Sequence, residues 1–263
     1  GYSSAASDVY KRQDMQTAKD AGILPMMTYA KDGGTSFVFQ ALMANNSSAE
    51  DVQNWILQKS GTFDNQAAQD AASTLQDWNN KGYMPEGVNA VDASTALSRF
   101  CNGEGLFFPS GNWNLDTVAK ALGDDVQFFA FPGATSEDEP NVAANAGAFY
   151  GIPVNAKNRD AAAAFLDYTQ SAEAQQIIVD NSGYLPKSST SDLKANSALQ
   201  QSMFDAYADV LMSGHTSDFI NNATAGMQSS GLIPNFQLLL DNSITPQEFT
   251  KNVQAQYDKE AKR

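Results

Sequence analysis

A tryptophan set between two asparagines is the first feature of the sequence with clear binding chemistry. Residues 110–114 read Ser-Gly-Asn-Trp-Asn and follow the short apolar run Gly-Leu-Phe-Phe-Pro. An aromatic ring offers a flat apolar face and amides exchange hydrogen bonds, so the group suits a ligand with a C–H face and a rim of hydroxyls, such as a sugar. Gly111 would let the backbone turn tightly behind the ring. Trp113 and Asn112 are therefore candidate ligand contacts; alternatively, Trp113 only plugs the space between a strand and the next helix.

A second polar cluster lies near the C-terminal end, where Asp218, Asn221 and Asn222 precede an expected helix. Their side chains have the chemistry to bind ligand hydroxyls. Asp218 or Ser217 would serve equally well as an N-cap of that helix. Asp218 is kept as a candidate ligand contact with this alternative open.

Catalysis has little support in the sequence. Ser110 lacks the Gly-x-Ser-x-Gly setting of a nucleophile elbow, and the one histidine, His215, lies in a loop of small polar residues. Cys101 is the one cysteine, which rules out an internal disulfide and a zinc site built from cysteines. The 30 acidic residues leave open a pair of carboxylates for glycoside hydrolysis. We expect no enzyme, no metal site and no cofactor.

The composition and net charge of the chain limit the kinds of molecule that it is expected to bind. The 263 residues are 42% hydrophobic, enough for one large domain or two lobes, and the formal net charge is −14. Such a charge repels nucleic-acid phosphates and anionic lipid headgroups, so neither is an expected partner. No apolar run approaches the roughly 20 residues that span a bilayer.

Long helices alternating with a few short strands predict an α/β fold. Residues 35–44 are apolar but too short to assign from periodicity. Ser48 and Thr245 are expected to cap helices, and Thr245 has a glutamate three residues later. Helices are expected over 48–59, 65–83, 91–105, 115–123, 158–183 (as a pair), 192–214, 218–242 and 245–263, and strands over 105–113, 126–133 and 142–154.

Several segments, in their order along the chain, carry a family resemblance. They read DAGILPM, TLQDWNNKGYMPEG, STALSRFCNGEGLFFPSGNW, FAFPG, YGIPVNAKNRDAAAAFLDYTQSAEAQQIIVDNSGYLP and TPQEFTKNVQAQYDKE. The ordered set resembles the family-1 extracellular solute-binding proteins, the sugar-capturing components of ABC importers. The resemblance extends from Asp14 to the C-terminus, whereas residues 1–13 resemble a translated adapter and are set aside.

The resemblance implies a two-lobed, periplasmic-binding-protein-like fold of type II, with sugar held between the lobes. It assigns residues 14–149 and 191–263 to the second lobe, and residues 150–190 to the returning part of the first lobe, including a crossing strand. Most of the first lobe would then be missing from this chain. One alternative is then that the chain has no activity, because its cleft lacks one wall, and that it exposes apolar lobe-interface surface and tends to associate.

The resemblance also adds candidate ligand contacts. Phe37, Phe39 and Gln40 lie where relatives carry an aromatic residue against the ligand, although the two phenylalanines could be one buried face of a strand. Asn145, Phe149 and Tyr150 lie where the chain crosses between lobes; there the two aromatic rings could instead serve hinge packing.

The leading hypothesis is a non-enzymatic binding protein outside the cytoplasm that captures a carbohydrate and delivers it to ABC permease subunits. Its lobes would close about residues 150–153, and its only membrane contact would be a lipid anchor on the missing N-terminus. The alternative is a carbohydrate-active enzyme or a non-transport lectin on a related scaffold.

Overall fold

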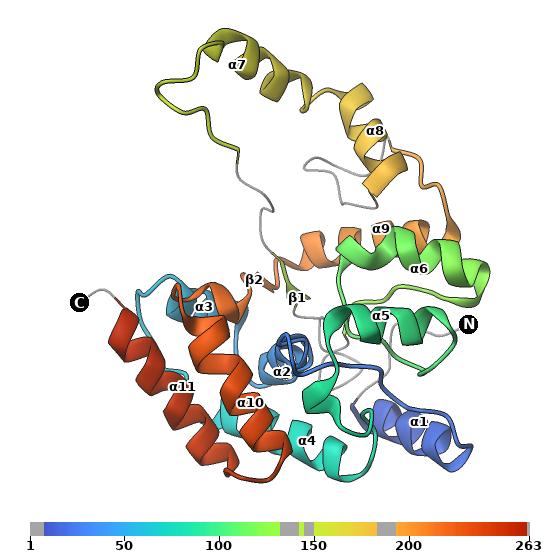
Figure 1. The fold of residues 1–263 in the computed structure, drawn as a ribbon, viewed down its shortest axis with the longest axis vertical. Coiled ribbons are helices and arrows are strands. Elements are labelled where there is room, and N and C mark those ends of the chain that lie inside the picture. Colours follow the sequence, from blue (N-terminus) through green and yellow to red (C-terminus); the bar gives the residue numbers. More distant parts are fainter. Residues whose placement is uncertain (1–7, 132–141, 145–149, 183–192, 262–263) are drawn as a thin grey trace. The chain divides into compact units, whose positions relative to one another are not determined.

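Helices dominate the part of the chain that the computed structural model describes, which is residues 8–131, 142–144, 150–182 and 193–261 (Figure 1). The α-helices are α1 Asp8–Asp20, α2 Thr35–Ala44, α3 Ala49–Ile56, α4 Gln66–Asn80, α5 Ala93–Cys101, α6 Leu115–Leu122, α7 Arg159–Tyr168, α8 Ala172–Ser182, α9 Ala198–Ser213, α10 Ile233–Leu240 and α11 Pro246–Glu260. Short helical turns are η1 Val88–Ala90, η2 Asn112–Asn114, η3 Gly123–Asp125 and η5 Ile220–Asn222, and a π-helical segment, η6, covers Met227–Leu232.

The chain divides into two compact units. Unit 1 consists of residues 1–110, 130–144 and 210–263, and unit 2 of residues 111–129 and 145–209. The lobe boundaries that the family resemblance implies stay a prediction. Helix α1 begins at Asp8. Residues 8–13, which belong to the adapter-like segment of the sequence, therefore form the first part of this helix.

The expected helix caps are confirmed. The Ser48 side chain accepts a hydrogen bond from the Asp51 backbone N–H at 3.0 Å, at the start of α3. At the start of α11, the side chains of Thr245 and Glu248 each accept a hydrogen bond from the other's backbone N–H, which is a complete capping box. These contacts satisfy N–H groups that the first helical turn leaves without a partner.

The expected strands are largely replaced by irregular backbone. Within the described residues, the strands are β1 Val142–Ala143 and β2 Thr216–Ser217, which pair in parallel in unit 1. The expected strand over 105–113 is reduced to one parallel bridge between Met26 and Phe107, and residues 126–131 form no strand. The ambiguous segment 35–44 is a helix.

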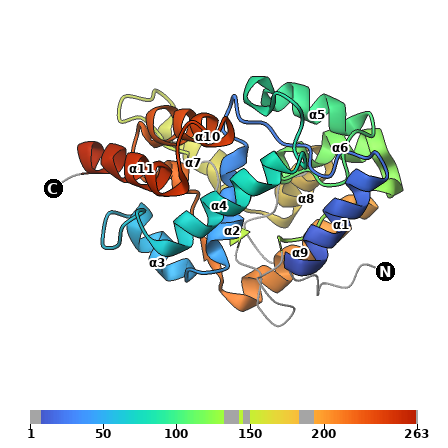
Figure 2. The same cartoon turned by 90° about the horizontal axis from the view of Figure 1, so that it is seen from below.

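Unit 1 packs its helices around α2. Helix α2 contacts α4, and α4 contacts both α10 and α11. Helices α10 and α11 lie side by side in two perpendicular views (Figures 1 and 2). The apolar face expected for α4 is confirmed, because its members are all buried: Ala68, Ala71, Ala72, Leu75 and Trp78.

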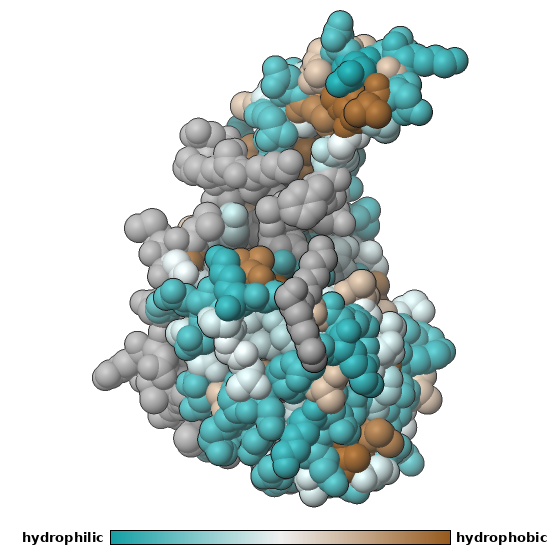
Figure 3. Space-filling view, turned by 90° about the vertical axis from the view of Figure 1, so that its left-hand side faces the viewer, coloured by the Kyte–Doolittle hydropathy of each residue, from teal (hydrophilic) through white to brown (hydrophobic). Residues whose placement is uncertain are grey.

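Unit 2 has a smaller core. Helix α6 packs on α8, with Val118 and Val179 among the buried side chains. Helix α7 contains no buried residue, and Phe165 is 63% exposed. Figure 3 shows apolar side chains gathered over α7, at the top of the view. Most residues of this helix are therefore exposed, including Phe165 and Tyr168.

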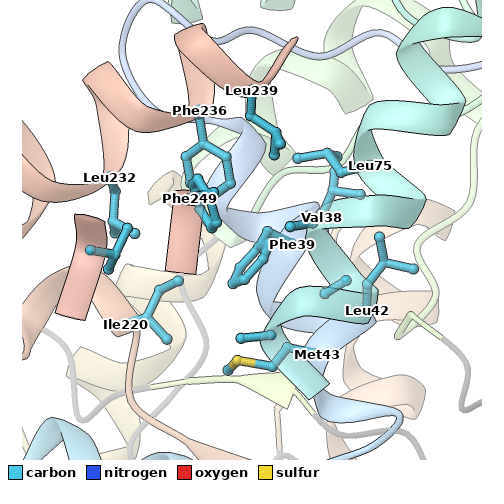
Figure 4. Packing of buried hydrophobic residues seen from close by; sticks show 14 of the residues in the cluster. Val38, Phe39, Leu42, Met43, Leu75, Ile220, Leu232, Phe236, Leu239 and Phe249 are labelled. Atoms are coloured by element: carbon cyan, nitrogen blue, oxygen red, sulfur yellow. The ribbon is translucent and has the colours of Figure 1, made fainter. Parts of the chain in front are cut away.

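Phe39 lies at the centre of the unit 1 core (Figure 4). Its ring meets those of Phe236 and Phe249 edge to face, each at 5.3 Å between centroids, and stacks on Phe63 at 5.6 Å. These rings come from α2, α10, α11 and the loop before α4. The helices are thus joined by one aromatic cluster whose geometry is favourable for aromatic pairs.

Candidate functional site

Trp113 occupies the centre of the turn η2, which leads directly into α6 in unit 2. Its side chain is 40% exposed, whereas Trp55 and Trp78, which the sequence assigns to the core, are 4% and 1% exposed. A tryptophan that only plugged a gap would be buried like those two. The neighbouring Asn112 is half-buried, so an aromatic face and an amide stand together at the surface of unit 2.

The glycine before this turn has a different role from the one expected. Gly111 has φ −133° and ψ 179°, an extended conformation open to any residue, so no tight turn requires it. However, a Cβ atom on Gly111 would overlap the six-membered ring of Trp113. Glycine is needed at this position because the ring lies directly against the backbone.

Phe37 lies on α2 and is half-buried. Its ring meets that of Phe219 edge to face, with 5.9 Å between centroids and 72° between planes. This pair joins α2 to the segment between β2 and η5. Both residues belong to unit 1.

Phe39 and Gln40 are both buried, and their contacts are structural. Phe39 has no exposed surface and packs inside the core, so its ring does not reach solvent or a ligand. The Gln40 amide nitrogen donates to the Asp218 carbonyl at 2.8 Å and to Ser217 Oγ at 3.2 Å. Its oxygen accepts from the Ile220 N–H at 3.1 Å. The amide therefore bonds to the backbone of Asp218 and Ile220 and to the side-chain hydroxyl of Ser217.

Asp218 is half-buried beside this segment. Its Oδ1 accepts hydrogen bonds from the Phe219 N–H at 2.7 Å and from the Asn222 side-chain amide at 2.9 Å. Its own N–H donates to Gln53 on α3 at 2.7 Å. The helical turn η5 starts after Phe219 and has no side-chain cap, so the capping alternative is not formed. The carboxylate instead braces its own loop and remains partly accessible.

Tyr150 belongs to unit 2 and is well exposed. Asn145 and Phe149 lie outside the described residues. The structure therefore brings together Phe37, Gln40 and Asp218 in unit 1, and Asn112 with Trp113 in unit 2.

Sequence reasoning missed Phe219 and Gln53. In the sequence, residues 218–222 stand out as a polar cluster rather than through the aromatic residue within it. Its signal was its position directly after Asp218, the same aromatic-beside-polar pattern as Asn112 and Trp113. Gln53 carries no such signal, because its role depends on how α3 packs against the 216–222 segment.

The described residues contain neither a candidate metal-binding group nor a candidate membrane span. No group of three or more histidine, cysteine, aspartate or glutamate side chains is placed to hold a metal ion among them. No helix in this part of the chain is long and apolar enough to cross a membrane. The candidate residues are aromatic, amide and carboxylate groups, which bind through stacking and hydrogen bonds.

The sequence from residue 5 to residue 204 matches the family described as bacterial extracellular solute-binding protein. The chain belongs to this family. Members of this family are solute-binding proteins. A search of curated protein sequences finds no match to this solute-binding protein.

Solved structures share the fold of this solute-binding protein. A chitin oligosaccharide binding protein superimposes with a TM-score of 0.81 at 18% sequence identity, covering 97% of this chain and 64% of its own. A binding protein in complex with raffinose gives 0.76 at 13% identity, covering 96% and 65%. A Streptococcus pneumoniae solute-binding protein in complex with the blood group A-trisaccharide gives 0.70 at 14% identity, covering 96% and 63%.

These superpositions confirm the two-lobed, type II binding-protein fold that the sequence predicts. The chain spans about two thirds of the length of these proteins, between 63% and 65% in the three described. Identities this low establish the fold and leave the ligand to be inferred from the residues of this chain.

Proposed function

We propose that this chain is the substrate-binding component of an ABC importer and that it captures a carbohydrate outside the cytoplasm. The observation that carries the proposal is Trp113, which is half-exposed on a fixed turn beside the amide of Asn112. A sugar has an apolar C–H face that stacks on such a ring and hydroxyls that bond to the amide. The solved proteins of the same fold include ones named for, or solved with, oligosaccharides, which supports the same ligand class.

Each unit carries proposed ligand contacts of its own. Those of unit 2 are Trp113, Asn112 and Tyr150, and those of unit 1 are Phe37 and Asp218. A ligand that binds one conformation of the chain better than another shifts the population toward that conformation. The chain would then present the bound form to the permease subunits. We further propose that the natural protein is held at the membrane by a lipid anchor.

The test is a panel of mono- and oligosaccharides, amino acids and short peptides screened by thermal shift. A ligand that binds only the folded state at 100 times its Kd adds about 2.7 kcal/mol of stability, which is readily measured as a higher Tm. We expect a carbohydrate to raise the Tm and Trp113→Ala to weaken its binding at least about tenfold, which corresponds to ~1.4 kcal/mol.

Tyr168→Ala is the matched control, because Tyr168 is 44% exposed and lies on α7 of the same unit. It should leave the affinity unchanged. A Tm increase with amino acids or peptides, but with no sugar, would reject the carbohydrate ligand. Release of shortened sugars from a bound oligosaccharide would reject the binding role in favour of an enzyme.

A further inference from the structure

The Phe37–Phe219 pair lies next to the point where the chain leaves unit 1. Ala144 is the last residue of unit 1 before the chain continues into unit 2. Its N–H donates to the Ser217 carbonyl at 2.8 Å, directly after the pairing of β1 with β2. Phe219 is two residues further along. Phe219 thus closely follows the strand β2, whose pairing with β1 belongs to unit 1.

The backbone on both sides of Phe219 is held firmly. Asp218 is bonded through its N–H to Gln53 and through its carbonyl to Gln40. On the other side, Ile220 is buried and its N–H donates to the same Gln40 amide. Displacing the buried Gln40 amide is costly, because the backbone groups that it pairs would lose their hydrogen bonds at a place that water does not reach. The residue between them is therefore fixed in place.

Phe219 is half-buried. Its edge-to-face contact with Phe37 is a favourable aromatic geometry and restricts the ring. A ring that is held before a ligand arrives loses little side-chain entropy on binding. Phe219 therefore has two properties of a preorganised contact: a fixed backbone and a restricted, partly accessible ring.

Polar groups flank this ring. Asp218 is half-buried. Among the described residues, its carboxylate accepts two hydrogen bonds, and both are accepted by Oδ1. Asn222 is exposed and holds that carboxylate. An apolar ring beside a carboxylate and an amide matches the C–H face and hydroxyl rim of a sugar, as Trp113 does in unit 2.

We propose that Phe219 is a ligand-contacting residue of unit 1, with Phe37 supporting its ring and Asp218 accepting hydrogen bonds from ligand hydroxyls. The inference rests on the proposed carbohydrate function and assigns a second aromatic contact to it. Gln40 and Gln53 are positioning residues, since they act through the backbone of the segment that carries Phe219.

The experiment is calorimetric titration of the chain with the carbohydrate that gives the largest thermal shift. Phe219→Leu keeps the apolar volume and removes the aromatic face, and we expect it to weaken binding at least about tenfold. Phe219→Tyr restores an aromatic face and should stay within about threefold of the parent. Phe165→Leu makes the same change at an exposed position on α7 and should have no effect.

The outcomes separate the two proposals. If Trp113→Ala weakens binding while Phe219→Leu binds like the parent, the role of Phe219 is overturned and the carbohydrate function stands. If no carbohydrate binds the parent chain, the function fails and this inference falls with it. Equal loss in Phe219→Leu and Phe219→Tyr would show a packing role and would also overturn the inference.

A second measurement avoids variants that do not fold. 4-Fluorophenylalanine incorporated at position 219 of the otherwise unchanged chain reports on the environment of that ring. The carbohydrate should shift its ¹⁹F resonance and should leave that of the same label at position 165 unchanged. An unchanged resonance at position 219 in the presence of saturating carbohydrate would contradict direct contact.

Discussion

Exposure distinguishes aromatic residues that hold the fold from those that are available to a ligand. Trp55 stacks on Tyr257 at 4.7 Å between centroids, and the Tyr257 hydroxyl donates to the Trp55 carbonyl. Both are locked in the core of unit 1. Trp113 has the same ring but lies on a surface turn, against the backbone of Gly111. The chemistry of a side chain thus suggests that it can bind a ligand, and its packing decides whether a ligand can reach it.

Gly111→Ala should move the Trp113 ring without unfolding the chain. The added methyl group would occupy the space of the ring, so the ring must turn away, while the extended backbone of Gly111 accepts alanine readily. We expect a shifted emission maximum and stronger acrylamide quenching of Trp113 fluorescence, with sugar binding weakened at least about fivefold, roughly 1 kcal/mol. Trp55 and Trp78 are buried and contribute an unquenched background.

Gly151→Ala is the control for this change in fluorescence. Gly151 also lies in unit 2, and no atom stands within 4 Å of where its Cβ would be. Its substitution should leave the quenching of Trp113 as in the parent. Identical quenching in Gly111→Ala and the parent would show that the ring does not depend on the close approach to Gly111.

Gln40→Leu should destabilise unit 1. The substitution leaves the Ile220 N–H and the Asp218 carbonyl without their partner inside the protein. Each buried polar group left unpaired costs about 1–3 kcal/mol, so we expect a loss of roughly 2–4 kcal/mol in the free energy of unfolding, measured with urea. Gln66→Leu, the same change at an exposed position of α4, should cost less than about 0.5 kcal/mol. Equal losses of unfolding free energy in Gln40→Leu and Gln66→Leu would show that the buried Gln40 amide does not stabilise unit 1.

At the scale of elements, the sequence predicted most helices, because their signals are local. The helix expected over 218–242 is an exception, since the structure has the turn η5, the π-helical segment η6 and the shorter helix α10 there. A cap such as Ser48 or Thr245 and an apolar face such as that of α4 lie within a few residues of each other. Strands were predicted poorly, because a strand exists only if another segment pairs with it. Residues 126–131 have the apolar composition of a strand, but no strand forms there.

The same distinction explains the candidate site. Trp113 was found from its residue type and its neighbours, which are local features. Phe39 could not be assigned, because the apolar run 35–44 fits a strand or a buried helix equally well. In the helix that forms, Phe39 faces the core, whereas Phe37 is half-buried against Phe219. Assigning these residues required knowing which face of α2 is covered by other elements.

The capping box of α11 predicts a dependence of stability on pH. Hydrogen bonds from the backbone and then the side chain of Thr245 lower the pKa of Glu248. Because the pKa is lower in the folded state, the ionised carboxylate stabilises the fold above the ordinary pKa of a glutamate carboxyl, and this contribution is lost as the pH falls through the lower pKa of the folded state. Helix α11 should therefore be held less firmly in acid.

Glu248→Gln tests this because the amide does not ionise. We expect the parent to be slightly more stable than Glu248→Gln at pH 7, with the difference shrinking toward zero as the pH falls through the lowered pKa of Glu248. Thermal unfolding from pH 3 to pH 7 measures this difference in stability. The control is Glu86→Gln, which removes the same charge from a loop. A difference that stays constant with pH would mean that the charge of Glu248 plays no part.

At the scale of the whole molecule, the two units bury very different amounts of apolar surface. Most of the buried apolar side chains belong to unit 1, including the aromatic cluster around Phe39. The buried apolar side chains described in unit 2 are Leu115, Val118, Ala174, Val179, Leu199, Met203 and Phe204. Unit 2 also exposes large apolar side chains: Phe129, Tyr150, Val154, Phe165, Tyr168 and Ile177, besides Trp113. The units should therefore differ in local stability.

Amide hydrogen exchange should reveal this difference along the chain. Helix α7 has ten residues and none of them is buried, and a helix of that length is marginal in water without packing. We expect its amides to exchange at least about 100-fold faster than those of α4, whose buried face opens only with the core of unit 1. Helix α11 is the internal reference for slow exchange, because Phe249 and Val253 are fully buried. Protection of α7 equal to that of α4 would contradict the exposure of α7; protection that disappears on dilution would show that a second copy of the chain covers it.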